Sequence, residues 1–459
     1  MLITKKQFAH EARLSIKIAM PLIASNLIQA SSGFIGTIMI AHLGKDAIAA
    51  VAVGWAVYIA LIVFFFGILN SISVYIAQNY GAKNCQNVAK AASHGVLLSI
   101  AISVPMLAVM LGTPFLLRAI EHNPHIVILA ANYLHALIWC IVPLSLSIAL
   151  EQIMVGLGKT QLVLWISIIQ VPFEILATWL LIFGKLGLPK CGVAGIGYGF
   201  AIIFVLSAAL IMLYLHKSPG YKKYHLFSYL NRFSRKWFFD LIKTGWPIGA
   251  MNIIEVAWFS VIAMLMSKIG NDQLVAYQIT RQFWLMAMMI VFAMSQTTTV
   301  RIGHAVGEKN KDAIARSAFT NTIVSFAIIL LIAICYIIFN RYLISIDINI
   351  ADPKYQATVH FAEIFITLAS IAMLIDNFRF IIVGALRGLK DTRMPMGISA
   401  VSFWVIALPL AYIFAFSIKF GGSGLWYAFL TGVILNTLFL LIRFMQLTKN
   451  ISLDKVLEK

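Results

Sequence analysis

The chain has 459 residues, of which 61% are hydrophobic and only 11% are charged, and its mean hydropathy is +0.91. An ordinary soluble domain carries roughly 25% charged residues, so this much apolar surface cannot be buried in one water-soluble core. The composition excludes a soluble globular protein and predicts an all-α polytopic membrane protein.

Twelve apolar runs are long enough to span a bilayer, which takes about 20 helical residues. The predicted spans are 17–42, 47–78, 91–114, 125–155, 161–184, 193–215, 241–267, 273–300, 317–340, 357–386, 394–418 and 423–446. Most Lys and Arg residues lie in one of the two alternating sets of connections, the set that contains both termini and the 216–240 loop. The positive-inside rule places this set in the cytoplasm. The net charge of +18 therefore reflects topology, and no nucleic-acid partner is expected.

The sequence predicts no cleavable signal peptide, no use of ATP, no disulfides and no zinc site. The N-terminal region carries charges through Lys17 and runs into the first span without a small-residue cleavage site, so no cleavable signal peptide is predicted. The segment GLGKT (156–160) resembles the end of a phosphate-binding loop, but Ile153 stands where that loop needs glycine. No soluble stretch is long enough for an ATPase domain, so the chain is not expected to use ATP. Four scattered cysteines predict neither disulfides nor a zinc site: Cys85, Cys140, Cys191 and Cys335.

An internal repeat relates the two halves of the chain. A shift of 226 residues aligns 21–90 with 247–316 without a gap and gives 14 identities in 70 positions, more than apolar composition alone explains. The matched polar and helix-breaking positions include Pro21 with Pro247, Asn26 with Asn252, Gly44 with Gly270 and Asp46 with Asp272. Six spans per repeat is an even number, so the two repeats run through the membrane in the same direction, as in secondary transporters.

The repeat also predicts the domain organisation. Residues 1–215 form an N-lobe of six spans, 216–240 a cytoplasmic linker and 241–459 a C-lobe of six spans. The mixed basic and aromatic composition of the linker suits a helix lying on the inner leaflet.

Ionisable side chains inside spans are costly and are functional candidates by default. Glu255 shares a helix face with Asn252, Trp258 and Phe259. Its repeat partner is Gln29, so the scaffold does not require a charge at this position, although a purely structural carboxylate satisfied by its neighbours is the alternative.

Span ten carries Asp376 and Arg379, which can meet on one face because they are three residues apart. A simple intrahelical salt bridge is the alternative interpretation, but a buried pair gives weak evidence of stability. On span eight, Gln278 and Arg281 can face the same cavity, and a structural counter-ion role for Arg281 stays open. These two arginines would balance Glu255 and Asp376.

Span five carries Glu174 two residues after Pro172, where proline frees backbone carbonyl groups. Polar groups near a broken span often build transporter sites, so a functional role is favoured for Glu174. Glu151 lies nearer the cytoplasmic end of its span, and an ordinary solvated carboxylate is favoured there.

The motifs taken together resemble the multidrug and toxic compound extrusion (MATE) transporters, in particular the NorM-like branch. The resemblance covers nearly the whole chain and is carried by Pro21, QNYGAKN (78–84), Glu255, AYQI (276–279) and DNFRFIIVGALRGLKDT (376–392). It implies a V-shaped pair of six-helix lobes that exports amphipathic organic cations in exchange for H+ or Na+ by alternating access. It also implies a monomeric secondary transporter rather than an enzyme, without a cofactor, in a bacterial-type inner membrane.

Two positions depart from the NorM-like pattern. Gly36 stands where the branch usually has Asp in span one, and Glu174 stands at the second Asn of the usual Asn-x-Pro-x-Asn of span five. In another branch that second position is acidic and belongs to a proton site. The resemblance thus implies that the acidic group of the N-lobe has moved from span one to span five.

The resemblance assigns ion coupling to Glu255, Asp376 and Glu174, with Arg281 and Arg379 as charge partners. Substrate contacts are predicted for Asn252, Trp258, Phe259, Gln278 and Phe283, because a methionine- and aromatic-rich wall can bind flat cations. Pro21, Pro172 and Pro247 are predicted to act as hinges.

The two coupling ions place different demands on this site. NorM-like carboxylates imply a Na+ site at Glu255 and Asp376, yet a nearby arginine would repel Na+ by about 3 kcal/mol at roughly 6 Å and an effective dielectric of about 20. A proton meets a smaller penalty, so H+ is favoured over Na+. The alternative function is a lipid-linked precursor flippase of the same superfamily, which usually has additional spans and a more basic cleft. A channel or receptor fits poorly with the repeat.

Overall fold

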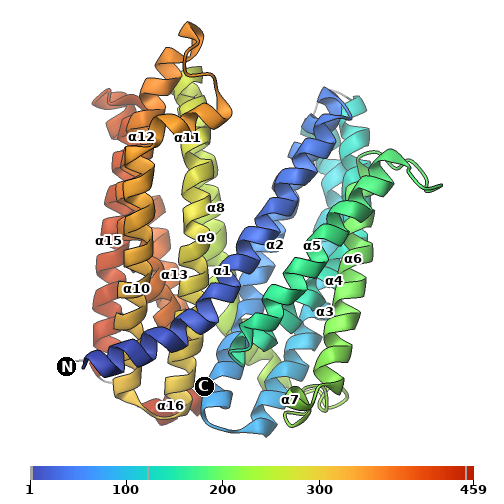
Figure 1. The fold of residues 1–459 in the computed structure, drawn as a ribbon, viewed down its shortest axis with the longest axis vertical. Coiled ribbons are helices and arrows are strands. Elements are labelled where there is room, and N and C mark those ends of the chain that lie inside the picture. The colour runs from blue at the N-terminus through green and yellow to red at the C-terminus, as the bar shows by residue number, and fades with distance from the viewer. Residues whose placement is uncertain (1–3, 121–123, 450–451, 459) are drawn as a thin grey trace. The chain divides into compact units, whose positions relative to one another are not determined.

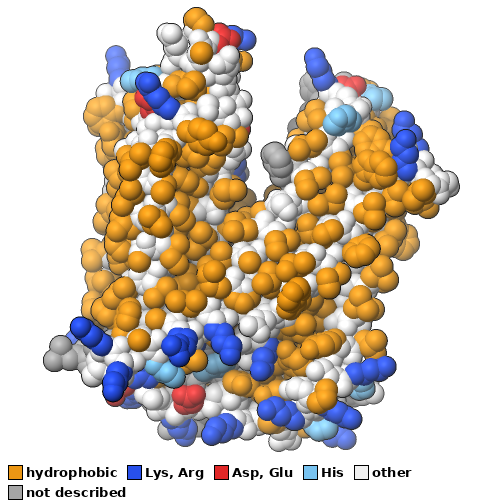
Figure 2. Space-filling model, in the orientation of Figure 1, with side chains coloured by type: hydrophobic (Ala, Val, Ile, Leu, Met, Phe, Trp, Pro, Cys, Tyr) orange, Lys and Arg blue, Asp and Glu red, His pale blue; other side chains and the backbone are white. Residues whose placement is uncertain are grey.

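The computed structural model describes residues 4–120, 124–449 and 452–458, and every regular element among them is a helix (Figure 1). Twelve helices in this part of the chain are long and apolar enough to cross a membrane. Hydrophobic side chains cover the flanks of these helices, whereas Lys and Arg gather near helix ends (Figure 2). The predicted all-helical polytopic fold with twelve spans is confirmed.

The helices follow the predicted order. The first half contains α1 (Lys5–Ala41), α2 (Lys45–Gly81), α3 (Cys85–Ile120), α4 (Pro124–Gly156), α5 (Thr160–Phe183), α6 (Ala194–Lys217) and α7 (Pro219–Lys222). The second half contains α8 (Arg235–Ile269), α9 (Asn271–Gly307), α10 (Lys311–Ile338), α11 (Asn340–Asp347), η1 (Pro353–Tyr355), α12 (Gln356–Gly388), α13 (Arg393–Ala400), η2 (Val401–Ala407), α14 (Leu408–Tyr412), η3 (Ile413–Ser417), α15 (Gly421–Lys449) and α16 (Leu453–Glu458). Together α13, α14 and the π-helical segments η2 and η3 form the eleventh span.

Backbone contacts divide the chain into two compact units. The N unit is Met20–Gly249, and the C unit combines Met1–Ala19 with Ala250–Lys459. Helices α1 and α8 therefore each contribute to both units. The predicted lobes 1–215 and 241–459 divide the chain at other residues and stay predictions.

The start of α8 belongs to the N unit because it packs closely on α2. A Cβ atom added to Gly67 would lie 2.4 Å from the Cα atom of Gly249, so a larger side chain would separate the two helices. The hydroxyl groups of Tyr75 and Thr244 lie 3.2 Å apart in the same contact. The first four turns of α8 are thus held to α2.

The internal repeat appears as two turns with closely similar backbone geometry. In the N unit, Lys83 adopts a left-handed φ of 55° and its amide donates to the carbonyl of Tyr80 at 3.0 Å. In the C unit, Lys309 adopts a φ of 53° and donates to Val306 at 3.0 Å. Both pairs of positions differ by the 226 residues of the sequence repeat.

The linker between the halves differs from the predicted interfacial helix. Only α7 is helical before α8 begins at Arg235, and the intervening residues form turns. Ser93 and His94 of α3 hold this segment: the Ser93 hydroxyl donates to the carbonyl of Leu226 at 2.8 Å, and the Ser234 amide donates to His94 Nε2 at 2.8 Å. The polar side chains of α3 satisfy linker backbone groups that a helix would have paired internally.

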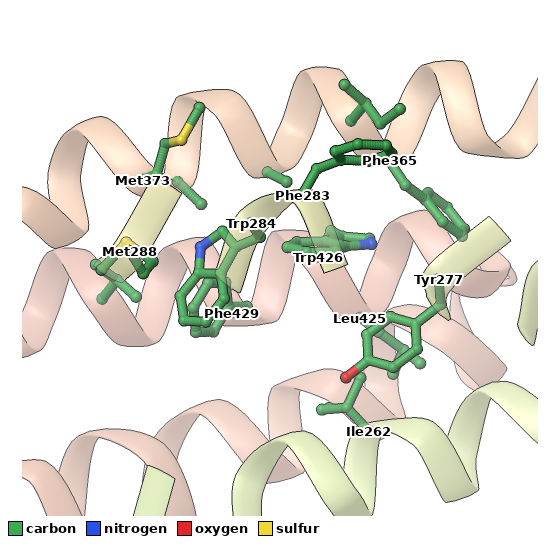
Figure 3. Packing of buried hydrophobic residues seen from close by; sticks show 14 of the residues in the cluster. Ile262, Tyr277, Phe283, Trp284, Met288, Phe365, Met373, Leu425, Trp426 and Phe429 are labelled. Carbon is green, nitrogen blue, oxygen red and sulfur yellow. The ribbon is translucent and has the colours of Figure 1, made fainter. Parts of the chain in front are cut away.

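An aromatic core fills the centre of the C unit (Figure 3). Trp284 of α9 lies edge-on to Phe429 of α15 with ring centroids 6.1 Å apart, and Trp426 lies 5.9 Å from the same ring. Aromatic pairs of this kind add about 0.5–1.5 kcal/mol each beyond the burial of their area. The core therefore fixes the relative positions of α8, α9, α12 and α15, on which the charged residues lie.

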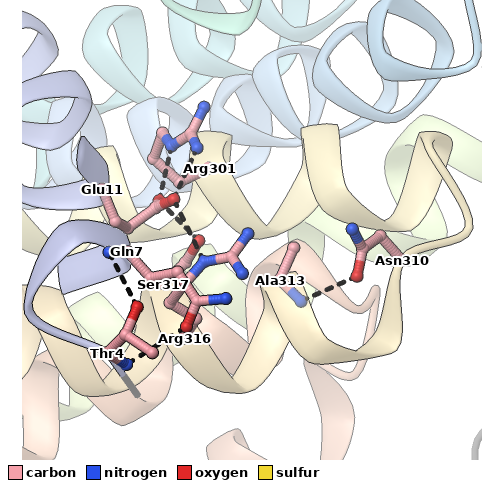
Figure 4. A network of polar contacts seen from close by, with 8 residues as sticks. All are labelled: Thr4, Gln7, Glu11, Arg301, Asn310, Ala313, Arg316 and Ser317. Carbon is pink, nitrogen blue, oxygen red and sulfur yellow. Dashed lines mark hydrogen bonds and ion pairs between the residues drawn. The ribbon is translucent and has the colours of Figure 1, made fainter.

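The N-terminal turns of α1 are anchored to the C unit through Glu11 (Figure 4). The Glu11 carboxylate is 1% exposed and accepts hydrogen bonds from Arg301 Nε at 2.8 Å, Arg301 Nη2 at 2.9 Å and Ser317 Oγ at 2.7 Å. Arg316 Nε lies 3.9 Å away. We call Glu11, Arg301, Arg316 and Ser317 the N-terminal anchor.

The other end of the chain packs on the same helices. Leu453 and Val456 of α16 belong to a small apolar cluster with Ile302 of α9 and Leu389. Since Arg301 and Ile302 are adjacent on α9, both terminal segments dock at one end of the C unit.

Candidate functional site

Arg379 of α12 lies between two carboxylates of the C unit. Its Nε donates to Asp376 Oδ1 on the same helix, and its Nη1 donates to Glu255 Oε1 on α8 at 2.6 Å. Asp376 is 0% exposed, Arg379 is 2% exposed and Glu255 is 16% exposed. We call these three residues the triad. With all three ionised, the triad carries a net charge of −1.

Aromatic rings hold the guanidinium of Arg379 in place. Its Cζ lies 4.0 Å from the ring centroid of Phe380 and 5.3 Å from that of Phe403. Such cation–π contacts are worth about 2 kcal/mol when desolvated. The guanidinium is thus positioned by packing as well as by its two carboxylates.

The triad leaves one buried carboxylate oxygen without a donor. Asp376 Oδ2 has no hydrogen-bond partner among the described residues. Leaving a buried polar atom unsatisfied typically costs about 1–3 kcal/mol. This oxygen is therefore a place where a proton or a cation would be stabilised.

Close packing of α9 against α12 fixes the backbone beneath the triad. The Ser295 hydroxyl donates to the carbonyl of Phe380 at 2.6 Å, and the Thr299 hydroxyl donates to the carbonyl of Gly384 at 2.9 Å. A Cβ on Gly384 would lie 2.3 Å from the Ser295 carbonyl oxygen, so only glycine permits this approach.

Arg281, the second predicted charge partner, does not join the triad. Its guanidinium lies over the ring of Phe259 at 5.9 Å, and no ion pair links it to a carboxylate among the described residues. The structure thus brings together three of the four charged residues that the sequence predicts to balance one another in this unit.

The predicted substrate-contact residues fall into two groups. Gln278 is exposed, and Asn252 and Phe259 are partly exposed, whereas Trp258 and Phe283 are 2% and 8% exposed and belong to the aromatic core. Trp258 packs on Phe403 with centroids 5.6 Å apart. Phe283 lines a small cavity together with Thr280, Trp284, Tyr336, Ile366, Ala369, Ser370 and Met373. Substrate contact stays a prediction for all five.

The N unit holds a separate acidic site at Glu174 of α5. Glu174 is 6% exposed, its Oε1 accepts a short hydrogen bond from the Ser32 hydroxyl of α1, and its Oε2 accepts one from Gln170 Nε2 at 3.5 Å. No arginine or lysine among the described residues pairs with this carboxyl group.

Polar side chains continue from Glu174 along the contact between α1 and α5. The Ser25 and Ser167 hydroxyls lie 2.6 Å apart, and Gln29 Nε2 donates to Ser167 Oγ at 3.1 Å. Gln29 is the repeat partner of Glu255, so the equivalent position contacts a serine in one unit and an arginine in the other.

The three predicted hinge prolines all lie inside helices: Pro21 in α1, Pro172 in α5 and Pro247 in α8. Pro21 and Pro247 lie within three residues of the positions at which α1 and α8 pass from one unit to the other. Proline removes a helix hydrogen bond and weakens the helix locally. Hinge motion itself stays a prediction.

Two features of these sites were not predicted from the sequence. The hydroxyl of Ser32 could not be assigned to Glu174 because the two residues are 142 positions apart. Arg387 lies one residue beyond the predicted span 357–386, but in the structure it belongs to the last turn of α12, with its Nε buried and unpaired among the described residues. Its spacing of eight residues from Arg379, a little over two helical turns, was the available signal.

The described residues contain no group of three or more His, Cys, Asp or Glu side chains arranged to hold a metal ion. Na+ is often coordinated by backbone and hydroxyl oxygens, so the Na+ alternative at Glu255 and Asp376 stays open as a prediction.

The chain is similar to known proteins over nearly its whole length. The MatE family model matches residues 21–180 and 247–413, the two segments related by the repeat. The chain is 28% identical over 449 residues to a probable multidrug resistance protein NorM of Bradyrhizobium diazoefficiens, covering 98% of this chain and 96% of the relative. It is 26% identical over 439 residues to the multidrug resistance protein NorM of Aliivibrio fischeri, covering 95% and 94%.

Solved structures have the same fold. An outward-facing multidrug resistance MATE family transporter matches with a TM-score of 0.86 at 18% identity, covering 96% of this chain and 97% of that chain. A eukaryotic MATE transporter, AtDTX14, matches with a TM-score of 0.84 at 16% identity, covering 98% of each chain.

Proposed function

The chain belongs to the MatE family of membrane transporters, and we propose that it is a multidrug efflux antiporter that exports amphipathic organic cations in exchange for protons. The observation that carries this proposal is the contact of Arg379 with both Glu255 and Asp376. A site with two acids and one base in a membrane span has one negative charge available for a mobile cation.

Exchange follows from competition at the triad. A substrate cation and a proton both reduce the net negative charge of Glu255, Arg379 and Asp376, so binding of one weakens binding of the other. Such mutual exclusion is what an antiporter needs, because it prevents the coupling ion and the substrate from crossing together. Alternating access then carries each in its own direction.

The proton is favoured over Na+ by the position of Arg379. Na+ would have to bind beside a guanidinium that donates to both carboxylates, at a cost of about 3 kcal/mol at roughly 6 Å and an effective dielectric of about 20. A proton binds to a single oxygen, such as Asp376 Oδ2, and needs no set of ligands. Arg281 forms no ion pair with either carboxylate among the described residues.

A second proton site is proposed at Glu174. Its partners, Ser32 and Gln170, are neutral. A proton can therefore bind to or leave this carboxyl group without breaking an ion pair. This would supply the acidic group that Gly36 does not provide.

The driving force is sufficient for concentrative export. Exchange of one proton for one monovalent organic cation moves no net charge across the membrane, so the pH gradient supplies the driving force. Each pH unit yields about 1.4 kcal/mol, which supports a concentration ratio of about one decade. We further propose that the chain lies in a bacterial-type inner membrane with both termini in the cytoplasm, works as a monomer and uses neither ATP nor a cofactor.

The test is efflux of a fluorescent organic cation from proteoliposomes that contain the full chain. A pH gradient in Na+-free buffer is expected to drive efflux, and dissipating it with a protonophore should stop efflux. If efflux requires a Na+ gradient instead, proton coupling is wrong. If neither gradient moves the dye, the antiport proposal fails.

A further inference from the structure

The linker between the two halves carries an unbalanced positive charge. No Asp or Glu occurs between residues 216 and 239, and all six basic side chains of this segment are exposed. They are Lys217, Lys222, Lys223, Arg232, Arg235 and Lys236. None of them forms an ion pair with an acidic side chain among the described residues. The segment therefore has more positive charge than its own side chains can balance.

Three basic side chains near helix ends of the C unit lie beside acids instead. Arg301 and Arg316 share the carboxylate of Glu11, and Arg443 Nε lies 2.7 Å from Asp391 Oδ2. These ion pairs reduce the electrostatic field that the helix ends present to a ligand. The charge of the linker, in contrast, is left for a partner from outside the chain.

Contacts with α3 hold the linker backbone, so its charges are displayed on an ordered surface. The Ser93 hydroxyl donates to the carbonyl of Leu226 at 2.8 Å and accepts from the amide of Tyr229 at 3.2 Å. Gln86 Nε2 donates to the Tyr229 hydroxyl at 3.1 Å, and Lys90 Nζ lies 5.7 Å from the centroid of the same ring. A ligand that binds an ordered surface loses less affinity to the cost of ordering it.

Two exposed phenylalanines lie among these charges. Phe233 is 61% exposed and Phe239 is 53% exposed. Arg232 directly precedes Phe233, and the guanidinium carbon of Arg235 lies 5.8 Å from the ring centroid of Phe239. Figure 2 shows basic side chains at the end of the N unit where Figure 1 places α7. Apolar rings beside basic groups are typical of segments that lie at the surface of a membrane.

We propose that the linker binds the phosphate groups of anionic phospholipids such as phosphatidylglycerol. Helix α6 ends at Lys217 and α8 begins at Arg235, and both helices are long and apolar enough to cross a membrane. The linker that joins them therefore lies close to lipid headgroups. Arg232, Arg235 and Lys236 donate charge-assisted hydrogen bonds to the phosphates, and the two exposed rings enter the boundary between headgroups and acyl chains. The inference depends on neither the transported substrate nor the coupling ion.

The test is binding of a fluorescent phosphatidylglycerol to the purified full chain in detergent, measured by fluorescence polarisation. The competitors are unlabelled phosphatidylglycerol, phosphatidylcholine, inorganic phosphate and an acidic peptide. The variant carries Arg232→Gln together with Lys236→Gln. The matched control carries Lys185→Gln together with Lys190→Gln, which removes two positive charges from exposed positions between α5 and α6 of the same unit.

We expect unlabelled phosphatidylglycerol to displace the probe and phosphatidylcholine to leave it bound, because only the first lipid has a net negative charge. Each basic residue near an anionic lipid surface contributes about fivefold in affinity. The linker variant should therefore bind the probe about 25-fold more weakly, whereas the control should change by less than about twofold. Added salt should weaken binding because it screens exposed charges.

Four results would overturn the lipid-binding surface. Equal displacement by the two lipids would show that headgroup charge is not recognised, and equal losses in the variant and the control would exclude the linker as the site. Displacement by inorganic phosphate as effective as that by phosphatidylglycerol would identify a phosphate site. Stronger displacement by the acidic peptide would assign the surface to a protein. The competition experiments use the unmodified protein, so they decide the matter even if the linker variant does not fold.

Discussion

The acidic sites of the two units lie on helices that the repeat does not pair, and they differ in their partners. In the N unit, Glu174 is held by a hydroxyl and an amide, whereas in the C unit Glu255 and Asp376 share the guanidinium of Arg379. Because the partners of Glu174 are neutral, a proton can bind to it or leave it without breaking an ion pair. In the C unit, the arginine competes with every incoming cation for the carboxylates.

This difference assigns separate tasks to the units. Protonation of Glu255 would weaken its contact with Arg379, which joins α8 to α12, so it can alter helix packing in the C unit. Protonation of Glu174 leaves its partners in place and changes only the charge of the site. We therefore expect substitutions in the triad to affect transport more than substitutions at Glu174.

The largest effect is expected from Asp376→Asn and Glu255→Gln. Each removes the net negative charge of the triad, so no cation is held, and export should fall to background. Insertion should be unaffected because removing a charge from a span does not hinder insertion. The measurement is efflux in proteoliposomes together with drug resistance of cells at matched expression.

Glu363→Gln is the control for this pair of variants. Glu363 also lies on α12, but it pairs with Arg341 outside the triad. Its export should equal that of the unmodified protein. Wild-type resistance in Asp376→Asn or Glu255→Gln would remove that residue from the mechanism.

A smaller effect is expected from Glu174→Gln. We expect export to slow by about tenfold, equivalent to roughly 1.4 kcal/mol, and its pH dependence to change because one titratable site is lost. Rates would be measured across a series of pH values at a constant pH gradient. A rate and pH profile identical to those of the unmodified protein would mean that the C unit alone performs the coupling.

Glu11 is an arginine-paired carboxylate outside the transport sites. Glu11→Gln should lower stability by about 1–3 kcal/mol, since it leaves the Arg301 guanidinium without its carboxylate partner, and should lower the melting temperature in detergent. Glu363→Gln, whose partner is largely exposed, should cost less than about 1 kcal/mol. Equal melting temperatures would show that the N-terminal anchor contributes nothing to stability.

The smallest effect is expected from Ser32→Ala. It removes one donor to Glu174 while Gln170 remains, so export should slow by about two- to fivefold, the effect of a hydrogen bond worth about 0.5–1 kcal/mol. The control is Ser31→Ala, because the neighbouring Ser31 hydroxyl donates to the carbonyl of Ile28 and does not contact Glu174. Equal rates in the two variants would contradict a role for the Ser32 hydrogen bond.

Local patterns in the sequence were enough to predict the helices and one charged contact. Apolar runs locate the spans because a bilayer requires about 20 apolar residues, and the repeat explains the matching turns at Lys83 and Lys309. The pairing of Asp376 with Arg379 followed from their spacing of three residues on one helix.

Contacts between distant helices could not be predicted from spacing. Helical periodicity gives the face of a residue, but not which face of another helix it meets. Spacing paired Arg379 with Asp376, but it could not show that Arg379 also reaches Glu255 and that Arg281 does not. The burial of Trp258 in the aromatic core depends in the same way on the packing of α13 to α15 around α8.

The N-terminal anchor has a consequence for synthesis of the protein. Glu11 and Arg301 are separated by 290 residues, so the ribosome makes the acidic partner long before its arginine exists. Until α9 and α10 have been inserted, the amino-terminal turns of α1 have no docking site, and the Glu11 carboxylate stays hydrated. The first segment to be translated thus waits for helices of the second half of the chain before it reaches its final contacts.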